Sequence, residues 1–83
     1  MSAETDEILA TFTDLLRGPT GDGKMKRDAG TKPHWMIDTS HPDAIVHHYG
    51  EWLLGHKFDA ESGSHHLVHV AWRCLAIAAQ ETP

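Results

Sequence analysis

The sequence predicts an all-α fold, a small helical bundle of about three helices that is completed by oligomerisation. Residues 1–17, 41–56 and 64–81 repeat apolar side chains at helical spacing, and a long stretch rich in glycine and proline follows the first segment. At 83 residues the chain makes one domain, which is marginally stable alone unless a metal ion, disulfides or further subunits support it. Because Cys74 is the only cysteine, disulfides within the chain are excluded.

Charge and hydropathy exclude two classes of partner. The net charge is −5 with neutral histidines, which argues against bulk binding to nucleic acid. No apolar run approaches the roughly 20 residues of a membrane-spanning helix, and the acidic start of the chain is unlike a signal peptide. Cys74 lies in an apolar run, where we expect a buried, inert thiol of the kind found in a reducing compartment. We therefore expect a soluble, cytoplasmic protein.

Residues 1–17 are predicted to form the first helix. Ser2 or Thr5 can cap its start, and acidic residues in its first turn suit the positive end of the helix dipole. Gly18-Pro19 is expected to end it. Its apolar stripe consists of Ile8, Leu9, Phe12, Leu15 and Leu16.

Residues 18–40 are predicted to form a long loop, since they hold several glycines and prolines and no sustained periodicity. Loops of this length inside a compact domain are usually functional or disordered. Basic residues are concentrated in this loop ahead of Trp35. They suggest that the loop binds phosphates and that the ring of Trp35 stacks on a nucleotide base. A solvated linker explains residues 18–27 equally well, whereas residues 28–38 look more ordered. The basic residues are Lys24, Lys26, Arg27 and Lys32.

Residues 41–56 are predicted to form the second helix, with Ser40 as its cap, Pro42 in its first turn and Gly55 at its end. His48 and Glu51 are i,i+3 neighbours on a polar edge of this helix, whereas His47 is expected to face solvent. The predicted core face consists of Ile45, Val46, Tyr49, Trp52 and Leu53.

Residues 64–81 are predicted to form the third helix, which carries a polar edge beside an apolar face. His66, His69 and Arg73 fall within roughly 60° of one another on a helical wheel. Apolar residues occupy both sides of this edge, so a second subunit is predicted to cover one of them. The expected core residues are Leu67, Val70, Ala71, Cys74 and Ala78, and the expected subunit contact consists of Val68, Trp72, Leu75 and Ala79.

The second and third helices each offer an i,i+3 polar pair, and a tight link makes the helices antiparallel neighbours. The link itself adds Asp59 and Glu61 to the imidazoles. A mixed set of this kind suits Mn²⁺, Fe²⁺ or Zn²⁺ better than Mg²⁺, which the carboxylates alone could hold. Any one of these histidines is more simply explained as a hydrogen-bonded structural residue, but their number and spacing favour a divalent metal site. The predicted ligands are His48, Glu51, Asp59, Glu61, His66 and His69.

The run from His48 through Gly55-His-Lys-Phe-Asp-Ala-Glu-Ser-Gly63 to His66-Leu-Val-His69 resembles the N-terminal-type domain of phage-encoded dATP/dGTP diphosphohydrolases. Asp28-Ala-Gly-Thr-Lys-Pro33 is similar to a Gly-Lys-Pro that precedes this run in relatives, and the resemblance covers about residues 26–80. His56 stands where relatives carry glutamate. The residues that match the motif are His48, Asp59, Glu61, His66 and His69.

This resemblance implies an all-α domain related to MazG-type nucleotide pyrophosphohydrolases, although the carboxylate signature of MazG is absent from comparable places. It leads us to expect a metal-dependent (deoxy)purine nucleoside triphosphate diphosphohydrolase, located in the host cytoplasm if phage-encoded. Glu61 and Asp59 are expected to be catalytic, and the substrate is expected to contact Lys32, Trp35 and Arg73. The alternative is a small phage protein that binds a nucleotide or a host protein without turnover.

Overall fold

A computed structural model gives the structure of residues 2–20 and 34–83, and in this part of the chain every regular element is helical. The elements are α1 (Ala3–Thr20), the short 3-10 helix η1 (His34–Met36), α2 (His41–Leu53) and α3 (His66–Glu81). Among the described residues there is no β-strand, and Phe58 and His65 form only an isolated bridge. The prediction of a small all-α bundle is confirmed.

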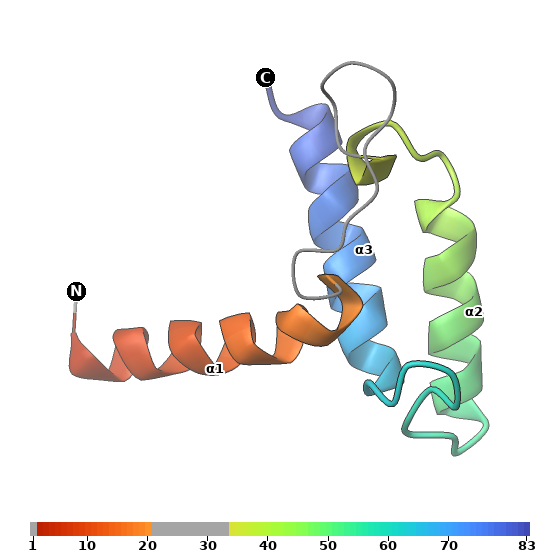
Figure 1. Ribbon diagram of the computed structural model, residues 1–83, viewed down its shortest axis with the longest axis horizontal. Coiled ribbons are helices and arrows are strands. Elements are labelled where there is room, and N and C mark those ends of the chain that lie inside the picture. Colours follow the sequence, from red (N-terminus) through yellow and green to blue (C-terminus); the bar gives the residue numbers. More distant parts are fainter. Residues whose placement is uncertain (1, 21–33) are drawn as a thin grey trace.

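The helices α2 and α3 lie side by side and antiparallel, and η1 sits against the far end of α3 (Figure 1). The turn after α2 sets this arrangement. Gly55 adopts a φ of 95° and its N–H bonds to the carbonyl of Trp52, while the N–H of His56 bonds to the carbonyl of Glu51. This pair of bonds around a left-handed glycine reverses the chain and ends α2 at Leu53.

The link between α2 and α3 is closed by its own backbone. The N–H of Asp59 bonds to the carbonyl of Ser64, and the N–H of Gly63 bonds back to Asp59, both at 2.8 Å. Gly63 has a φ of 77°, which only glycine adopts without strain. His65 then caps α3, because its ring Nδ1 accepts from the N–H of Leu67 at 3.0 Å. The link therefore presents its polar side chains from a fixed backbone.

Ser40 occupies the predicted cap position of α2, but its hydroxyl does not cap the helix. Instead, both its N–H and its hydroxyl donate to Oδ1 of Asp38, at 2.8 and 2.6 Å. Pro42 lies in the first turn of α2 as predicted. Asp38 thereby fixes the chain between η1 and α2.

The helix α1 extends away from the other two helices (Figure 1). Ser2 caps it as predicted, since its hydroxyl accepts from the N–H of Thr5. The expected end at Gly18-Pro19 is wrong, because α1 continues to Thr20. A proline so near the end of a helix removes one hydrogen bond and does not force the chain to turn. Gly18 lies against the hydroxyl of Ser64, which would have to shift if residue 18 carried a side chain, so the end of α1 approaches the start of α3 closely.

The expected core of α3 is correct only in part. Leu67 and Val70 are half-buried, but the polar edge faces α2 and the other three expected core residues are exposed. His66 is buried, whereas Cys74 is exposed, as are Ala71 and Ala78. The cause lies in the link, where the N–H of His66 bonds to the carbonyl of Lys57 and turns that side of α3 inward. Among the described residues, Ala76 is the only buried hydrophobic residue, at 5% exposure.

In the described part of the chain, none of the helices combines the length and the apolar character that crossing a bilayer requires.

Candidate functional site

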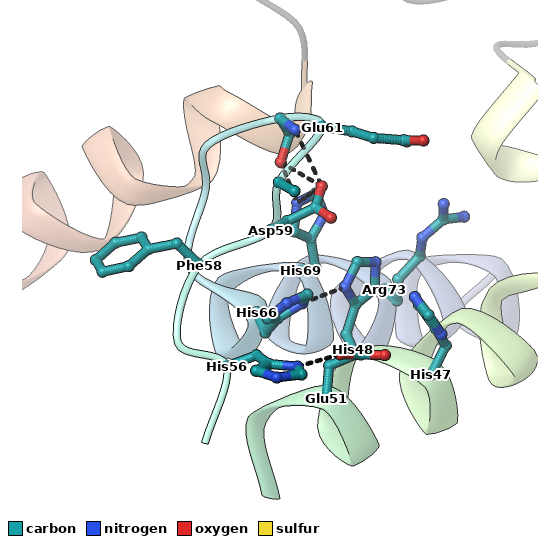
Figure 2. A pocket seen from close by; sticks show the side chains of 12 residues that line it. His47, His48, Glu51, His56, Phe58, Asp59, Glu61, His66, His69 and Arg73 are labelled. Atoms are coloured by element: carbon teal, nitrogen blue, oxygen red, sulfur yellow. Dashed lines mark hydrogen bonds and ion pairs between the residues drawn. The ribbon is translucent and has the colours of Figure 1, made fainter. Parts of the chain in front are cut away.

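An open pocket of about 880 Å³ lies where α2, the link and the start of α3 meet. Figure 2 shows the imidazoles of His48, His66 and His69 gathered between the two helices, with the link above them. The pocket is lined mainly by polar side chains, and Arg73 is the only lysine or arginine that the described part of the chain contributes to it. The lining residues are His47, His48, Glu51, His56, Phe58, Asp59, Ala60, Glu61, Ser62, His66, His69 and Arg73.

His48 of α2 meets His66 of α3 directly, with 2.8 Å between their Nδ1 atoms. Each residue lies on the polar edge predicted for its helix, and the antiparallel pairing brings the two edges together. Since both atoms are ring nitrogens, one must donate its proton while the other accepts. His66 is only 4% exposed, so this contact is largely shielded from water.

His69, Ser62 and Asp59 form a chain of hydrogen bonds at the wall of the pocket. The hydroxyl of Ser62 donates to Oδ2 of Asp59 at 2.8 Å and lies 2.8 Å from Nε2 of His69. Because the hydroxyl proton is directed to Asp59, Nε2 of His69 must carry a proton and donate to Ser62. In the neutral ring of His69, Nδ1 is therefore the atom that carries the lone pair and can accept a hydrogen bond.

Glu51 is turned away from this cluster by the chain reversal that ends α2. That reversal brings His56 back over the last turn, where its Nδ1 lies 2.6 Å from Oε2 of Glu51. The hydrogen bond from His56 is the main reason why the pKa of Glu51 lies below its usual value. Glu51 is thus occupied by His56 rather than by the imidazoles across the pocket.

Two imidazoles of the cluster favour their neutral form, because burial is the main cause that lowers the pKa of both His48 and His69. The neighbouring histidines lower the pKa of His48 further, whereas for His69 the carboxylate of Asp59 opposes the effect of burial in part. The pKa of Asp59 is also lowered, chiefly by the hydrogen bond from the Ser62 hydroxyl. The pocket therefore combines the neutral imidazoles of His48 and His69 with the ionised carboxylate of Asp59 near neutral pH.

Arg73 reaches the pocket from the next turn of α3 after His69. Its Nη1 lies 2.8 Å from Nδ1 of His41 and 3.5 Å from Oδ2 of Asp38. Its guanidinium carbon also lies 5.5 Å from the centre of the Trp72 ring. The guanidinium of Arg73 is held by residues that do not line the pocket, and its other N–H groups remain available to a ligand.

The chemistry of these donors suits a divalent cation, but their geometry in this structure does not. No three histidine, cysteine or carboxylate side chains among the described residues form a group that could hold a metal ion. The ring centroids of His48 and His69 are 4.3 Å apart with an angle of 7° between the planes. The nitrogen lone pairs therefore lie in two nearly parallel planes and do not converge on one ion. Only the pair of His48 and His66 comes near the ~2.9–3.4 Å expected between two nitrogens on one ion.

The predicted site residues divide into those that the fold brings together and those that it does not. Glu61 lies on the pocket rim, exposed and directed away from the imidazoles (Figure 2). Trp35, which is predicted to contact the substrate, does not line this pocket, since η1 places it beside a separate apolar pocket of about 350 Å³ with Trp72. Its contact with the substrate stays a prediction. Lys32 and the rest of the basic cluster lie outside the described residues. His47 is exposed as predicted, although it lines the pocket.

Sequence reasoning missed three residues that shape the site, namely Ser62, Asp38 and His41. Ser62 follows Asp59 by three residues, a spacing that predicts a local hydrogen bond between these two residue types. Asp38 precedes Ser40 by two residues, which is a similar signal. For His41 the sequence offers no signal, because its contacts come from residues distant along the chain.

Comparison with known proteins adds one finding. Residues 23–82 match the family described as dATP/dGTP diphosphohydrolase, N-terminal. Neither the curated proteins nor the solved structures contain a match. The matched range includes every residue that lines the pocket.

Proposed function

Because the chain belongs to the dATP/dGTP diphosphohydrolase, N-terminal, family, we propose that it hydrolyses purine deoxynucleoside triphosphates in the pocket between α2 and α3. One observation carries this proposal. The five residues that resemble the family motif come from α2, the link and α3, yet all of them line one pocket. These residues are His48, Asp59, Glu61, His66 and His69.

The proposed reaction is attack of water on the α-phosphorus of the nucleotide. The bond between this phosphorus and the oxygen that bridges it to the β-phosphorus breaks, and pyrophosphate leaves with the electron pair. The attacking water gives up a proton, which a carboxylate must accept. Glu61 suits this role, since it makes no hydrogen bond or ion pair with another described residue, whereas the Ser62 hydroxyl already occupies Asp59.

The negative charge of the phosphates needs donors on the other side of the pocket. Arg73 provides a fixed cation, and its planar guanidinium can bind two phosphate oxygens together. Neutral imidazoles add N–H donors without adding charge. Asp59 and Glu61 repel the phosphates, so Arg73 carries most of the neutralisation that the described residues supply.

A divalent cation stays a prediction for this family member. The described side chains do not fit a site with three protein ligands, so we assign no step to a cation. Their chemistry still admits Mn²⁺, Fe²⁺ or Zn²⁺, with Mg²⁺ held by carboxylates alone. Phage origin and a cytoplasmic location, which the sequence resemblance implies, also stay predictions.

Binding without turnover is the second candidate function. The stacked rings of His48 and His69 favour it, because imidazoles in this arrangement interact with each other rather than with a shared ion. A protein of this kind would hold a nucleotide, or a host protein, at the same pocket.

Pyrophosphate release from each of the four deoxynucleoside triphosphates, with Mg²⁺, with Mn²⁺ and with EDTA, separates these candidates. We expect release from dATP and dGTP in preference to dCTP and dTTP, and loss of release in EDTA. Nucleotide binding without any release would support the second candidate. A protein that shows no nucleotide binding and no pyrophosphate release would contradict both candidate functions.

A further inference from the structure

His41 has the most buried large side chain among the described residues, at 1% exposure, although it is polar. Its Nε2 lies 2.8 Å from the carbonyl oxygen of Trp35, and its Nδ1 lies 2.8 Å from Nη1 of Arg73. A carbonyl only accepts and a guanidinium only donates. The two contacts together therefore require a neutral ring with its proton on Nε2 and a lone pair on Nδ1.

Arg73 depends on this lone pair for its direction. The ion pair with Asp38 is longer, at 3.5 Å, and Asp38 is already engaged by Ser40 through its other oxygen. The face of the Trp72 ring attracts the guanidinium of Arg73 but offers no hydrogen-bond acceptor that would fix its direction. The contact with His41 is thus the one short, directed hydrogen bond that Arg73 makes in the described part of the chain, and His41 itself is not among the residues that line the pocket.

We infer that His41 is a positioning residue, which fixes the guanidinium of Arg73 so that its remaining N–H groups face a phosphate in the pocket. This inference rests on the proposed function, in which Arg73 binds the phosphates. It adds a residue that lies outside the pocket and outside the sequence motif. The ligand class is a polyphosphate, because one fixed, planar cation beside neutral imidazole donors recognises phosphate oxygens.

A merely structural role for His41 makes a different prediction, and Gln80 distinguishes the two. Gln80 donates to the carbonyl of Trp35 at 2.7 Å, as His41 does, and also to the carbonyl of Asp38 at 3.0 Å. Unlike His41, it makes no contact with Arg73. Both residues therefore fasten the segment from η1 to α2, but only His41 also directs the cation.

The test compares inorganic pyrophosphate binding by calorimetry in the complete chain and three variants. His41→Leu removes both ring contacts, and we expect binding to weaken by about tenfold, the effect of losing one hydrogen bond to a charged group. Gln80→Leu is the matched control, and we expect little change. His41→Gln offers a donor and an acceptor at similar spacing, so it should recover much of the affinity.

Equal weakening in His41→Leu and Gln80→Leu, or no recovery in His41→Gln, would overturn the inference. Nitrogen-15 NMR of the unaltered protein provides a second readout that needs no variant to fold. We expect the His41 signals of a neutral ring with its proton on Nε2, and the opposite tautomer would also overturn the inference. Pyrophosphate binding and the NMR measurement do not depend on turnover. If the protein proved inactive, the proposed function would be contradicted, whereas these two measurements would still test the role of His41.

Discussion

His48 and His69 lie with their rings stacked, and both are shielded from water by α2 and α3. Burial disfavours the charged imidazolium, and this is why the pKa of each lies below the ordinary value for histidine. The unfolded chain has no such restriction. The cluster therefore links the acidity of the solution to the stability of the fold.

We expect the free energy of unfolding to fall as the pH drops below about 6.5, the ordinary histidine pKa. In that range the unfolded chain takes up protons that the folded protein excludes, and the loss continues until the lowered pKa values of the folded state are reached. Replacing both residues, by His48→Gln and His69→Gln, should flatten this dependence.

Urea unfolding followed by circular dichroism at several pH values measures the effect. EDTA in every sample keeps metal binding out of the comparison. His47→Gln removes an exposed imidazole from the same helix and serves as the matched control. If the free energy of unfolding of the double variant depended on pH as it does in the original protein, burial of His48 and His69 would not be the cause of the pH dependence.

The link between α2 and α3 decides which side of each helix meets the other. Gly55 and Gly63 both adopt a positive φ. The backbone hydrogen bonds around these two glycines set the positions of Glu51, Asp59 and Ser62. An alanine at either position would have to enter the left-handed region, at a cost of about 1–2 kcal/mol. Gly50, in the middle of α2, has open space at its missing Cβ and no such need.

We predict that Gly63→Ala lowers the free energy of unfolding by about 1–2 kcal/mol, because it strains the turn that carries Asp59. Gly50→Ala should raise it by up to about 1 kcal/mol, since alanine favours a helix and nothing lies in its way. Thermal unfolding of the two variants beside the original protein measures both effects. The same sign for both changes would contradict this account of the link.

Much of the fold follows from local sequence signals, and the rest depends on contacts that periodicity does not encode. Ser2, Pro42 and Gly55 mark their positions at helix ends because caps and turns are local chemistry. The orientation of α3 was not predictable from its wheel, which shows apolar residues on both sides of the polar edge. Backbone bonds in the link resolve it, and they turn His66 inward and leave Cys74 exposed.

The site shows the same division. Spacing along α2 and α3 predicts that His48, His66 and His69 lie together, and the structure brings them together. Spacing does not predict that Glu51 pairs with His56, because that contact needs the chain reversal at Gly55. It also gives no hint that Arg73 is held by a residue at the start of another helix.

At the scale of the whole molecule, the described helices leave large hydrophobic side chains exposed to water, and Phe12 is 56% exposed. The helix α1 contributes a row of exposed apolar side chains and extends away from the α2–α3 pair (Figure 1). The row consists of Ile8, Leu9, Phe12 and Leu15.

We predict a homodimer or a higher oligomer in which a second copy covers this row. Phe12→Glu places a charge in its middle and should shift the protein toward monomers, measured by light scattering at micromolar concentration. Ala10→Glu puts the same charge on the other side of α1 and is the matched control. A stable monomer before any substitution would contradict the prediction.

The account centres on hydrolysis in the pocket between α2 and α3, and the steady-state rate of pyrophosphate release from dATP by Glu61→Gln tests it most directly. Glu61 is exposed and makes no bond to another described residue, so this change removes the proposed proton acceptor without disturbing the fold. We predict that kcat falls by about 100-fold or more while KM changes little. Glu81→Gln, at the far end of α3, is the control and should keep the full rate. A Glu61→Gln protein as fast as the original would contradict the account.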